Sequence, residues 1–163
     1  MKMRFYYYLL PRGDPSNPYY IIREAMLVDA EAPSDQEGMS LSQINRDNCL
    51  KMPYACYLLS SLKTDYDDDK EYCKEVLAQI DRLQRKEIDH YIAGRNDFSS
   101  TMNQHEVVME NYIFGECYEW PLSTFPLLHY KLALQGWLKF LDMPLSVDSE
   151  MTIDLPDLTP VSA

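Results

Sequence analysis

Hydrophobic residues dominate two short stretches at the start of the chain, and a segment of turn-forming residues separates them. Residues 4–10 and 19–28 are rich in the aromatic and aliphatic residues that favour β-strands. Residues 11–18 contain three prolines among other turn formers, which predicts a long and stiff turn. The three segments together predict a β-hairpin. Because successive side chains of a strand point to opposite faces, at least one ring of Tyr6–Tyr8 is expected to face away from the core.

Helical spacing of apolar residues follows an acidic loop over residues 29–38. Ser40 can cap the first predicted helix. The apolar residues of this helix at approximately helical intervals are Leu41, Ile44 and Leu50. Proline removes a hydrogen bond inside a helix, so Pro53 should end this helix and start a second piece over residues 54–62.

The clearest amphipathic pattern begins in the acidic run 65–71. The apolar residues at spacings of four, four and three are Tyr72, Val76, Ile80 and Leu83. Acidic residues at the start and basic residues at the end, Arg82, Arg85 and Lys86, both match the dipole of a helix. The pattern predicts an amphipathic helix of about five turns.

Alternation typical of β-strands returns after this helix. Residues 88–93 alternate, residues 94–103 form a turn-rich connection, and residues 105–114 alternate again. The residues of the second strand predicted to point inward are Val107, Met109 and Ile113. The two strands are expected to pair antiparallel, and residues 117–120 are predicted to add a third strand.

A broad apolar face marks the last predicted helix. Ser123 or Thr124 can cap it, and Pro126 is acceptable in its first turn. The residues of its apolar face are Leu127, Tyr130, Leu134, Trp137, Leu138 and Leu141. This spacing predicts a helix that packs flat on a sheet.

The order of these elements predicts an α+β fold, β-β-α-α-β-β-α, with helices on one face of an antiparallel sheet. A length of 163 residues with 46% hydrophobic residues fits a single domain, assigned to residues 1–142. Residues 143–163 have three prolines, only acidic charge and no period, so they are predicted to form a flexible acidic tail.

The chain is strongly acidic, and its charge is unevenly distributed. Its net charge is −11 and its isoelectric point is about 4.6. Acids cluster in residues 65–71 and along residues 106–119, and no Lys or Arg follows Lys139. Such a surface repels nucleic acid and anionic membranes and attracts basic proteins. A solvated acidic face is also common among soluble proteins, so charge alone leaves open whether there is a partner.

The sequence predicts a soluble, cytoplasmic protein. It has neither an apolar run of roughly 18 to 20 residues nor a signal-peptide cleavage site. The four cysteines, which are expected to be buried free thiols, are Cys49, Cys56, Cys73 and Cys117.

No constellation of residues in the sequence predicts catalysis, a cofactor or a metal site. His105 with Glu106, or His129 with Glu119, could exchange protons, but no recognisable frame holds either pair. The alternating acids within residues 65–71 lack the glycine and the distant glutamate of a calcium loop. Isolated glycines form no phosphate-binding loop. We therefore expect a protein that is not an enzyme and that has no catalytic residue, cofactor or metal.

Residues 118–125, Tyr-Glu-Trp-Pro-Leu-Ser-Thr-Phe, followed by the apolar helix ending in Trp137–Leu141, resemble bacterial immunity proteins encoded beside polymorphic toxins. These include proteins of contact-dependent growth inhibition systems. In many of them a strand with alternating Val and Glu leads through a Leu-Pro or Pro-Leu step into a last helix ending in Trp-x-x-Phe-Leu. The resemblance covers roughly the last third of the folded part. It implies a single-domain cytoplasmic inhibitor that binds a toxin domain, often a nuclease with a basic cleft.

The mechanism predicted on this basis is stoichiometric inhibition steered by charge, with the active site or substrate cleft of the toxin blocked. Acids would pair with Lys and Arg of the toxin, and exposed tyrosines would supply apolar contacts. A monomer without direct nucleic-acid or membrane binding is favoured. The predicted partner-binding residues are Asp65, Asp67, Asp68, Asp69, Glu71, Glu106, Glu110, Tyr112, Glu116 and Glu119.

Three alternatives remain open at the level of sequence. An acidic nucleic-acid mimic would share the charge, but it should space its carboxylates regularly, whereas here they lie in clusters. A regulatory subunit of a bacterial complex would share the sticky acidic surface. A small enzyme would need polar groups that converge in a pocket, which sequence neither shows nor excludes.

Overall fold

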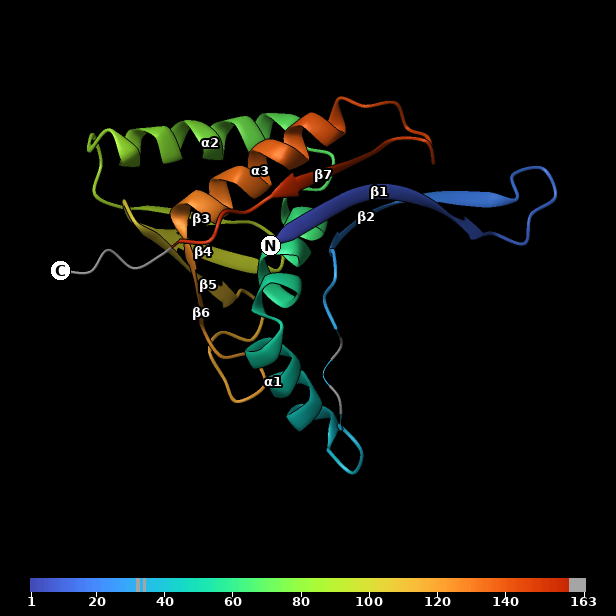
Figure 1. The fold of residues 1–163 in the computed structure, drawn as a ribbon, viewed down its shortest axis with the longest axis horizontal. Coiled ribbons are helices and arrows are strands. Elements are labelled where there is room, and N and C mark those ends of the chain that lie inside the picture. Colours follow the sequence, from blue (N-terminus) through green and yellow to red (C-terminus); the bar gives the residue numbers. More distant parts are fainter. Residues whose placement is uncertain (32, 34, 159–163) are drawn as a thin grey trace.

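The computed structural model, which describes residues 1–31, 33 and 35–158, begins with a long antiparallel hairpin. β1 (Lys2–Pro11) pairs with β2 (Tyr19–Leu27) from Met3 to Pro11. The other edge of β1 pairs with β7 (Glu150–Asp154), but only over Lys2–Tyr6. The predicted hairpin is confirmed, and it belongs to a three-stranded sheet of order β2-β1-β7. The part of the hairpin beyond the buried Tyr7 and the Arg23–Asp67 ion pair, residues 8–22, projects from the rest of the molecule (Figure 1).

A second antiparallel sheet is built from four strands in chain order, which are β3 (Tyr91–Gly94), β4 (Phe98–Met102), β5 (Glu106–Asn111) and β6 (Ser123–Pro126). The α+β class is therefore confirmed, whereas the prediction of one sheet and of the order β-β-α-α-β-β-α is wrong. β1 and β7 lie about 150 positions apart in sequence and pair directly, which local periodicity cannot reveal.

The prediction of a turn-rich connection over residues 94–103 is wrong because it contains β4. Small polar residues dominate this strand, yet Phe98, Ser100 and Met102 all face the core. Ser100 is accommodated there because its hydroxyl accepts a hydrogen bond from Tyr130 at 3.4 Å. A buried serine removes the alternation of apolar and polar residues that would reveal the strand.

The predicted strand over residues 117–120 is also absent. These residues form a tight turn, in which Cys117 and Trp120 exchange backbone hydrogen bonds of 3.2 and 3.3 Å. The strand lies instead at β6, so Ser123 and Thr124 are strand residues and do not cap a helix. The last helix begins after Pro126.

The first predicted helix is confirmed as α1 (Leu41–Lys51), which begins at a capping box formed by Ser40 and Gln43. Its predicted apolar face is wrong, because Leu41 and Leu50 are exposed. The second helical piece expected after Pro53 is present, but it contains two π-helical segments, η1 (Tyr54–Leu59) and η2 (Leu62–Tyr66), and so extends beyond the predicted residues 54–62.

The amphipathic helix is confirmed as α2 (Lys70–Gln84), with Val76, Ile80 and Leu83 buried. It starts later than predicted, because the capping residue is Asp69, and its 15 residues make about four turns. The last helix is α3 (Leu127–Leu141). Within the part of the chain that the structure describes, no helix has the length and apolarity needed to cross a membrane.

The core forms where α3 packs against α2 on one side and against strands of both sheets, including β7, on the other (Figure 1). Trp137 of α3 lies edge-on to Phe5 of β1, with ring centroids 5.3 Å apart. Gly136 permits this close approach, because a Cβ atom there would lie only 2.9 Å from Cγ2 of Ile153. The helix is thereby held against both β1 and β7.

The expectation of a flexible tail over residues 143–163 does not hold for β7 and the residues just after it. Leu155 is buried and donates its backbone N–H to the carbonyl of Met1 at 2.7 Å. The carbonyl of Pro156 lies 2.7 Å from Nε2 of His129. Residues 159–163 lie outside the described residues.

Candidate functional site

The acidic run, here called the acidic turn (residues 65–71), connects the end of η2 to the first turn of α2. Asp65 is only 5% exposed, and its carboxylate accepts backbone hydrogen bonds from Asp97 at 2.8 Å and Phe98 at 3.1 Å. Burial raises the pKa of Asp65 above its ordinary value, against the opposing effect of these hydrogen bonds. Asp65 therefore positions the acidic turn against the second sheet and presents no carboxylate to a partner.

The other acids of this turn differ in how far they are already paired. Asp67 accepts from Arg23 of β2 at 3.0 Å, and Asp69 accepts from Arg95 at 2.6 Å. Hydrogen bonds from the Tyr72 amide and then from Arg95 lower the pKa of Asp69. Asp68 and Glu71 are exposed, and Glu71 lies 3.3 Å from Lys74. Asp68 and Glu71 are thus the acids of the turn most open to a partner.

A loop of exposed aromatic and apolar residues connects β5 to β6 and is called the aromatic loop (residues 112–122). It begins where the side chain of Asn111 accepts hydrogen bonds from the amides of Ile113 and Phe114, at 3.0 and 2.9 Å. This turn ends the strand alternation, so the prediction that Ile113 points inward is wrong. The exposed fractions are 61% for Tyr112, 65% for Ile113, 65% for Phe114 and 58% for Tyr118.

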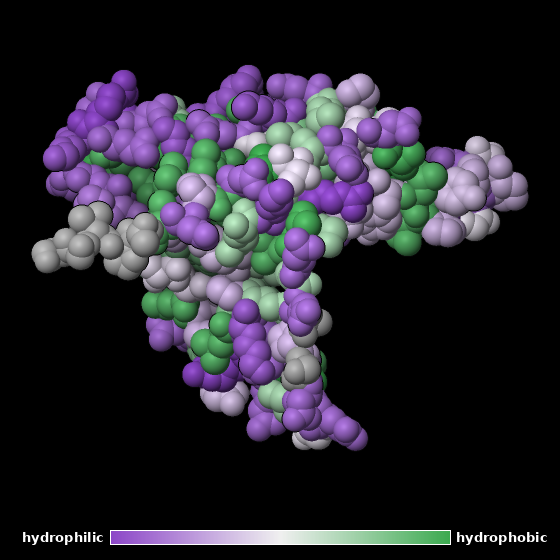
Figure 2. Space-filling model, in the orientation of Figure 1, coloured by the Kyte–Doolittle hydropathy of each residue, from purple (hydrophilic) through white to green (hydrophobic). Residues whose placement is uncertain are grey.

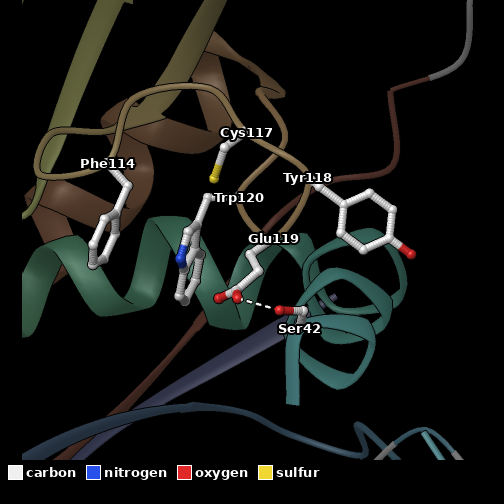
Figure 3. A pocket seen from close by; sticks show the side chains of 6 residues that line it. All are labelled: Ser42, Phe114, Cys117, Tyr118, Glu119 and Trp120. Atoms are coloured by element: carbon white, nitrogen blue, oxygen red, sulfur yellow. Dashed lines mark hydrogen bonds between the residues drawn. The ribbon is translucent and has the colours of Figure 1, made fainter. Parts of the chain in front are cut away.

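Side chains of helix α1 hold the aromatic loop in place through hydrogen bonds. The carboxylate of Glu119 accepts from Ser42 at 2.5 Å and from Asn45 at 3.0 Å, and Figure 3 shows it pointing toward Ser42. Arg46 donates to the carbonyl of Tyr118 at 2.9 Å, and its guanidinium lies 4.7 Å from the ring centroid of Tyr118. Two shallow hollows, of about 320 and 240 Å³, share Tyr118 as a lining residue.

The turn between β3 and β4 joins the acidic turn to the aromatic loop. Its residue Asp97 donates its amide to Asp65 and accepts the amide of Tyr112 at 2.7 Å. The ring of Tyr112 also lies near Gly94, where a Cβ atom would be 3.7 Å from Cε2 of the tyrosine. Both segments therefore border the β3–β4 turn, although they are about 45 residues apart in sequence, and together they are called the acidic–aromatic surface.

Of the ten residues predicted to bind a partner, the structure gathers most at this surface. Asp67, Asp68, Asp69 and Glu71 lie on the acidic turn, and Tyr112, Glu116 and Glu119 lie on the aromatic loop, with Asp65 buried beneath. Glu106 and Glu110 lie on the outer face of β5, and Glu106 is at the end of the strand far from the loop. The sequence did not predict Ile113, Phe114 or Tyr118, although Asn111 and Gly115 mark a turn there.

Replacing Glu119 by alanine is expected to loosen the aromatic loop while the rest of the fold stays intact, because α1 then loses its contact to the loop carboxylate. Hydrogen–deuterium exchange over residues 112–122 should increase about tenfold or more, because local opening no longer has to break the two hydrogen bonds to Glu119. Glu116→Ala is the matched control, since this exposed glutamate is not bonded to α1. Equal exchange in the two variants would contradict the tether.

The contact by which Glu119 holds the aromatic loop to α1 is also expected to depend on pH. Hydrogen bonds from Ser42 and then Asn45 lower the pKa of Glu119 below its ordinary value. A carboxyl whose pKa is lower in the folded state stabilises that state above its ordinary pKa, and this stabilisation is lost as the pH falls through the lowered value. Protection of the loop amides, which is exchange corrected for its intrinsic pH dependence, should therefore fall in acid for the wild type and change less in Glu119→Ala.

The sequence offered His129 as a candidate for proton exchange and the cysteines as buried free thiols, and the structure shows the surroundings of these residues. His129 is buried, with Nδ1 2.7 Å from the hydroxyl of Tyr54 and no contact to Glu119. Cys49 and Cys73 are buried free thiols as predicted, whereas Cys117 is exposed. The neighbouring Cys56 thiol lowers the pKa of Cys49 to about 7. Among the described residues, no group of three His, Cys, Asp or Glu side chains could hold a metal ion.

No protein-family model matches this chain, and comparison with curated proteins and with solved structures gives no significant match.

Proposed function

We propose that this chain is a bacterial immunity protein that binds a cognate toxin domain and neutralises it in a one-to-one complex. The toxin is a basic protein, with a nuclease domain as the first expectation. The inhibitor blocks the active site or the substrate cleft of the toxin. Its acidic–aromatic surface makes the contact.

The exposed aromatic loop is the observation that carries this proposal. Phe114 and Ile113 each leave 65% of their surface in solvent, and Tyr112 and Tyr118 are nearly as exposed. Contiguous exposed apolar side chains with a polar rim are typical of protein–protein interfaces. Aromatic residues at the centre of such an interface commonly supply most of the binding energy. A loop held by Glu119 and Arg46 also loses little conformational freedom on binding.

The charge of the chain favours a basic partner. The exposed carboxylates of the acidic–aromatic surface are those of Asp68 and Glu71 on the acidic turn and of Glu116 on the loop. With a net charge of −11, the molecule attracts a basic toxin over distance and accelerates its association. Asp67 and Asp69 already pair with Arg23 and Arg95, so a toxin arginine would have to displace these partners to reach them.

The arrangement of Glu119 supports binding more than catalysis. It is the carboxylate of the larger hollow, and both its oxygens accept hydrogen bonds from α1. A general base must point an oxygen lone pair at the proton that it abstracts, whereas both oxygens of Glu119 point toward donors of α1. Glu119 instead holds the aromatic loop to α1, which fits an inhibitor whose contact loop is already formed before binding.

The experiment that tests this function is co-expression with the toxin domain encoded by the adjacent gene in a sensitive bacterial host. The wild-type chain should restore growth and co-purify with the toxin at a one-to-one ratio, and nuclease activity on DNA or RNA should end at equimolar addition. Raising the salt concentration should slow association. A toxin that neither binds the chain nor loses activity contradicts the proposal.

A further inference from the structure

The larger hollow beside the aromatic loop combines aromatic rings with one carboxylate, and its volume is about 320 Å³. The residues that line it are Ser42, Phe114, Cys117, Tyr118, Glu119 and Trp120. Figure 3 shows the rings of Phe114 and Trp120 and the carboxylate of Glu119 pointing the same way from the loop. In Figure 2, hydrophobic and hydrophilic surface lie next to each other in the part of the molecule where this loop meets α1. Because the face of an aromatic ring carries partial negative charge, the rings and the carboxylate both favour a cation.

The negative charge of Glu119 is not balanced by a base of the described chain. Among the residues that the structure describes, no Lys or Arg forms an ion pair with its carboxylate. Its donors, Ser42 and then Asn45, are neutral and lower its pKa, so Glu119 stays ionised and is a weak base. A carboxylate can accept about four hydrogen bonds, so there is room for a further donor. Arg46 of α1 stacks on Tyr118 and lines the smaller hollow instead.

Arginine is the side chain that this protein itself places between an aromatic ring and a carboxylate. Three such groups are present, in which the guanidinium lies over a tyrosine ring and pairs with an acid. They are Arg4 with Tyr6 and Glu150, Arg23 with Tyr7 and Asp67, and Arg95 with Tyr72 and Asp69. The guanidinium carbons lie 4.3, 5.5 and 4.8 Å from the ring centroids, and the ion pairs measure 2.6, 3.0 and 2.6 Å. The larger hollow has the ring and the acid, Trp120 and Glu119, yet none of its lining residues is a base.

We propose that the larger hollow binds one arginine side chain of the partner protein, with its guanidinium stacked on the indole of Trp120 and paired with Glu119. Arginine fits better than lysine, because a planar guanidinium stacks on a ring while its N–H groups donate to a carboxylate. Tryptophan is the aromatic side chain that attracts cations most strongly. The identity of the partner, a basic toxin, rests on the proposed function, whereas recognition of the guanidinium rests on the hollow alone.

The walls of the hollow are held in place before a ligand arrives. Cys117 and Trp120 exchange backbone hydrogen bonds of 3.2 and 3.3 Å, and the carbonyl of Pro121 accepts the hydroxyl of the buried Tyr57. Helix α1 fixes the carboxylate of Glu119. An arginine that enters the hollow therefore has to order few groups of this chain, which favours its binding. Arginine and aromatic residues are also the side chains that most often dominate the binding energy of protein–protein interfaces.

Nuclear magnetic resonance with N-acetyl-arginine amide tests the hollow without the toxin. The indole N–H signal of Trp120 should shift in a saturable way, with a dissociation constant on the order of 10 mM at constant ionic strength. The buried indole of Trp137 serves as the internal reference and should not shift. N-acetyl-citrulline amide has nearly the same shape but no charge, so it should bind about fivefold more weakly or less. The absence of a saturable shift at Trp120, or equal binding of the two amides, overturns the proposal.

A charge-neutral variant separates the charge of Glu119 from its contact with α1. Glu119→Gln keeps an oxygen that can accept from Asn45 and gains an amide that can donate to the Ser42 hydroxyl, so exchange over residues 112–122 should stay unchanged. The preference for the arginine amide over the citrulline amide should be lost. Glu116→Gln is the matched control on the same loop, since Glu116 does not line the hollow. Preserved preference in Glu119→Gln, or equal loss in both variants, overturns the role of Glu119.

The toxin complex provides a test that can fail separately from the proposed function. In a double-mutant cycle, one arginine of the toxin should couple to Glu119, so that its replacement by alanine weakens binding to the wild-type chain about tenfold more than binding to Glu119→Gln. A one-to-one complex in which no toxin arginine couples to Glu119 overturns this inference and leaves the proposed function standing. A chain that binds the arginine amide at Trp120 but captures no toxin contradicts the proposed function and supports recognition of a guanidinium.

Discussion

Replacing Phe114 by alanine is expected to weaken binding of the toxin by about 2 kcal/mol or more, about thirtyfold in the dissociation constant. The ring is 65% exposed in the free chain and lies on a loop that α1 already holds in place. Its burial against a partner is therefore gained only on binding, and truncation removes this gain without disturbing the core. Titration calorimetry with the purified toxin domain measures the change, and growth protection should fall in parallel.

A matched control separates this effect from a general loss of surface hydrophobicity. Leu145 is 62% exposed and lies between α3 and β7, outside the acidic–aromatic surface. Leu145→Ala should leave the affinity unchanged, and Glu116→Ala should mainly lower the association rate, since rim charges act through steering. Unchanged affinity in Phe114→Ala would show that the toxin binds elsewhere on the chain.

The elements with strong periodicity were predictable from the sequence. The face of α2 is defined by Val76, Ile80 and Leu83, which recur at helical spacing and are all buried. The hairpin was equally clear, because a proline-rich turn separates its strands. β4 was missed because Ser100 occupies a buried position, and the pairing of β7 with β1 was missed because it is a contact between the two ends of the described chain.

The candidate surface was only partly predictable. Its acids were visible as clusters in sequence, but their roles depend on partners from other elements. Asp65 is buried by the β3–β4 turn, and Asp69 is paired by Arg95 from that same turn. The exposed ring of Phe114 was not predictable from hydrophobicity, because an apolar residue after a strand is more often buried. Only the three-dimensional structure distinguishes an aromatic side chain of the core from one at the surface that can contact a partner.

Replacing Trp137 by alanine is expected to lower the free energy of unfolding by about 3 to 5 kcal/mol, a large part of the stability of a domain of this size. The indole is fully buried and packs on Phe5 and Phe140, with centroid distances of 5.3 and 5.5 Å. Its removal leaves a cavity where α3, β1 and β7 meet, and Gly136 beside it offers no side chain to fill the space. Urea unfolding followed by circular dichroism measures the loss.

A second variant of Trp137 separates packing from hydrogen bonding at this position. The indole N–H of Trp137 donates to the carbonyl of Asp67 at 2.8 Å, so α3 also holds the acidic turn. Trp137→Phe keeps most of the packing, so it should cost clearly less than Trp137→Ala: about 1 kcal/mol for the lost hydrogen bond, and a further, smaller loss for the missing part of the indole. Trp120 is only half-buried on the aromatic loop, so Trp120→Ala should destabilise the fold far less than Trp137→Ala. Equal destabilisation by Trp137→Ala and Trp120→Ala would contradict the central role of Trp137 in the core. If the stable Trp137→Phe chain binds the toxin more weakly, the hydrogen bond from Trp137 also positions the acidic turn for binding.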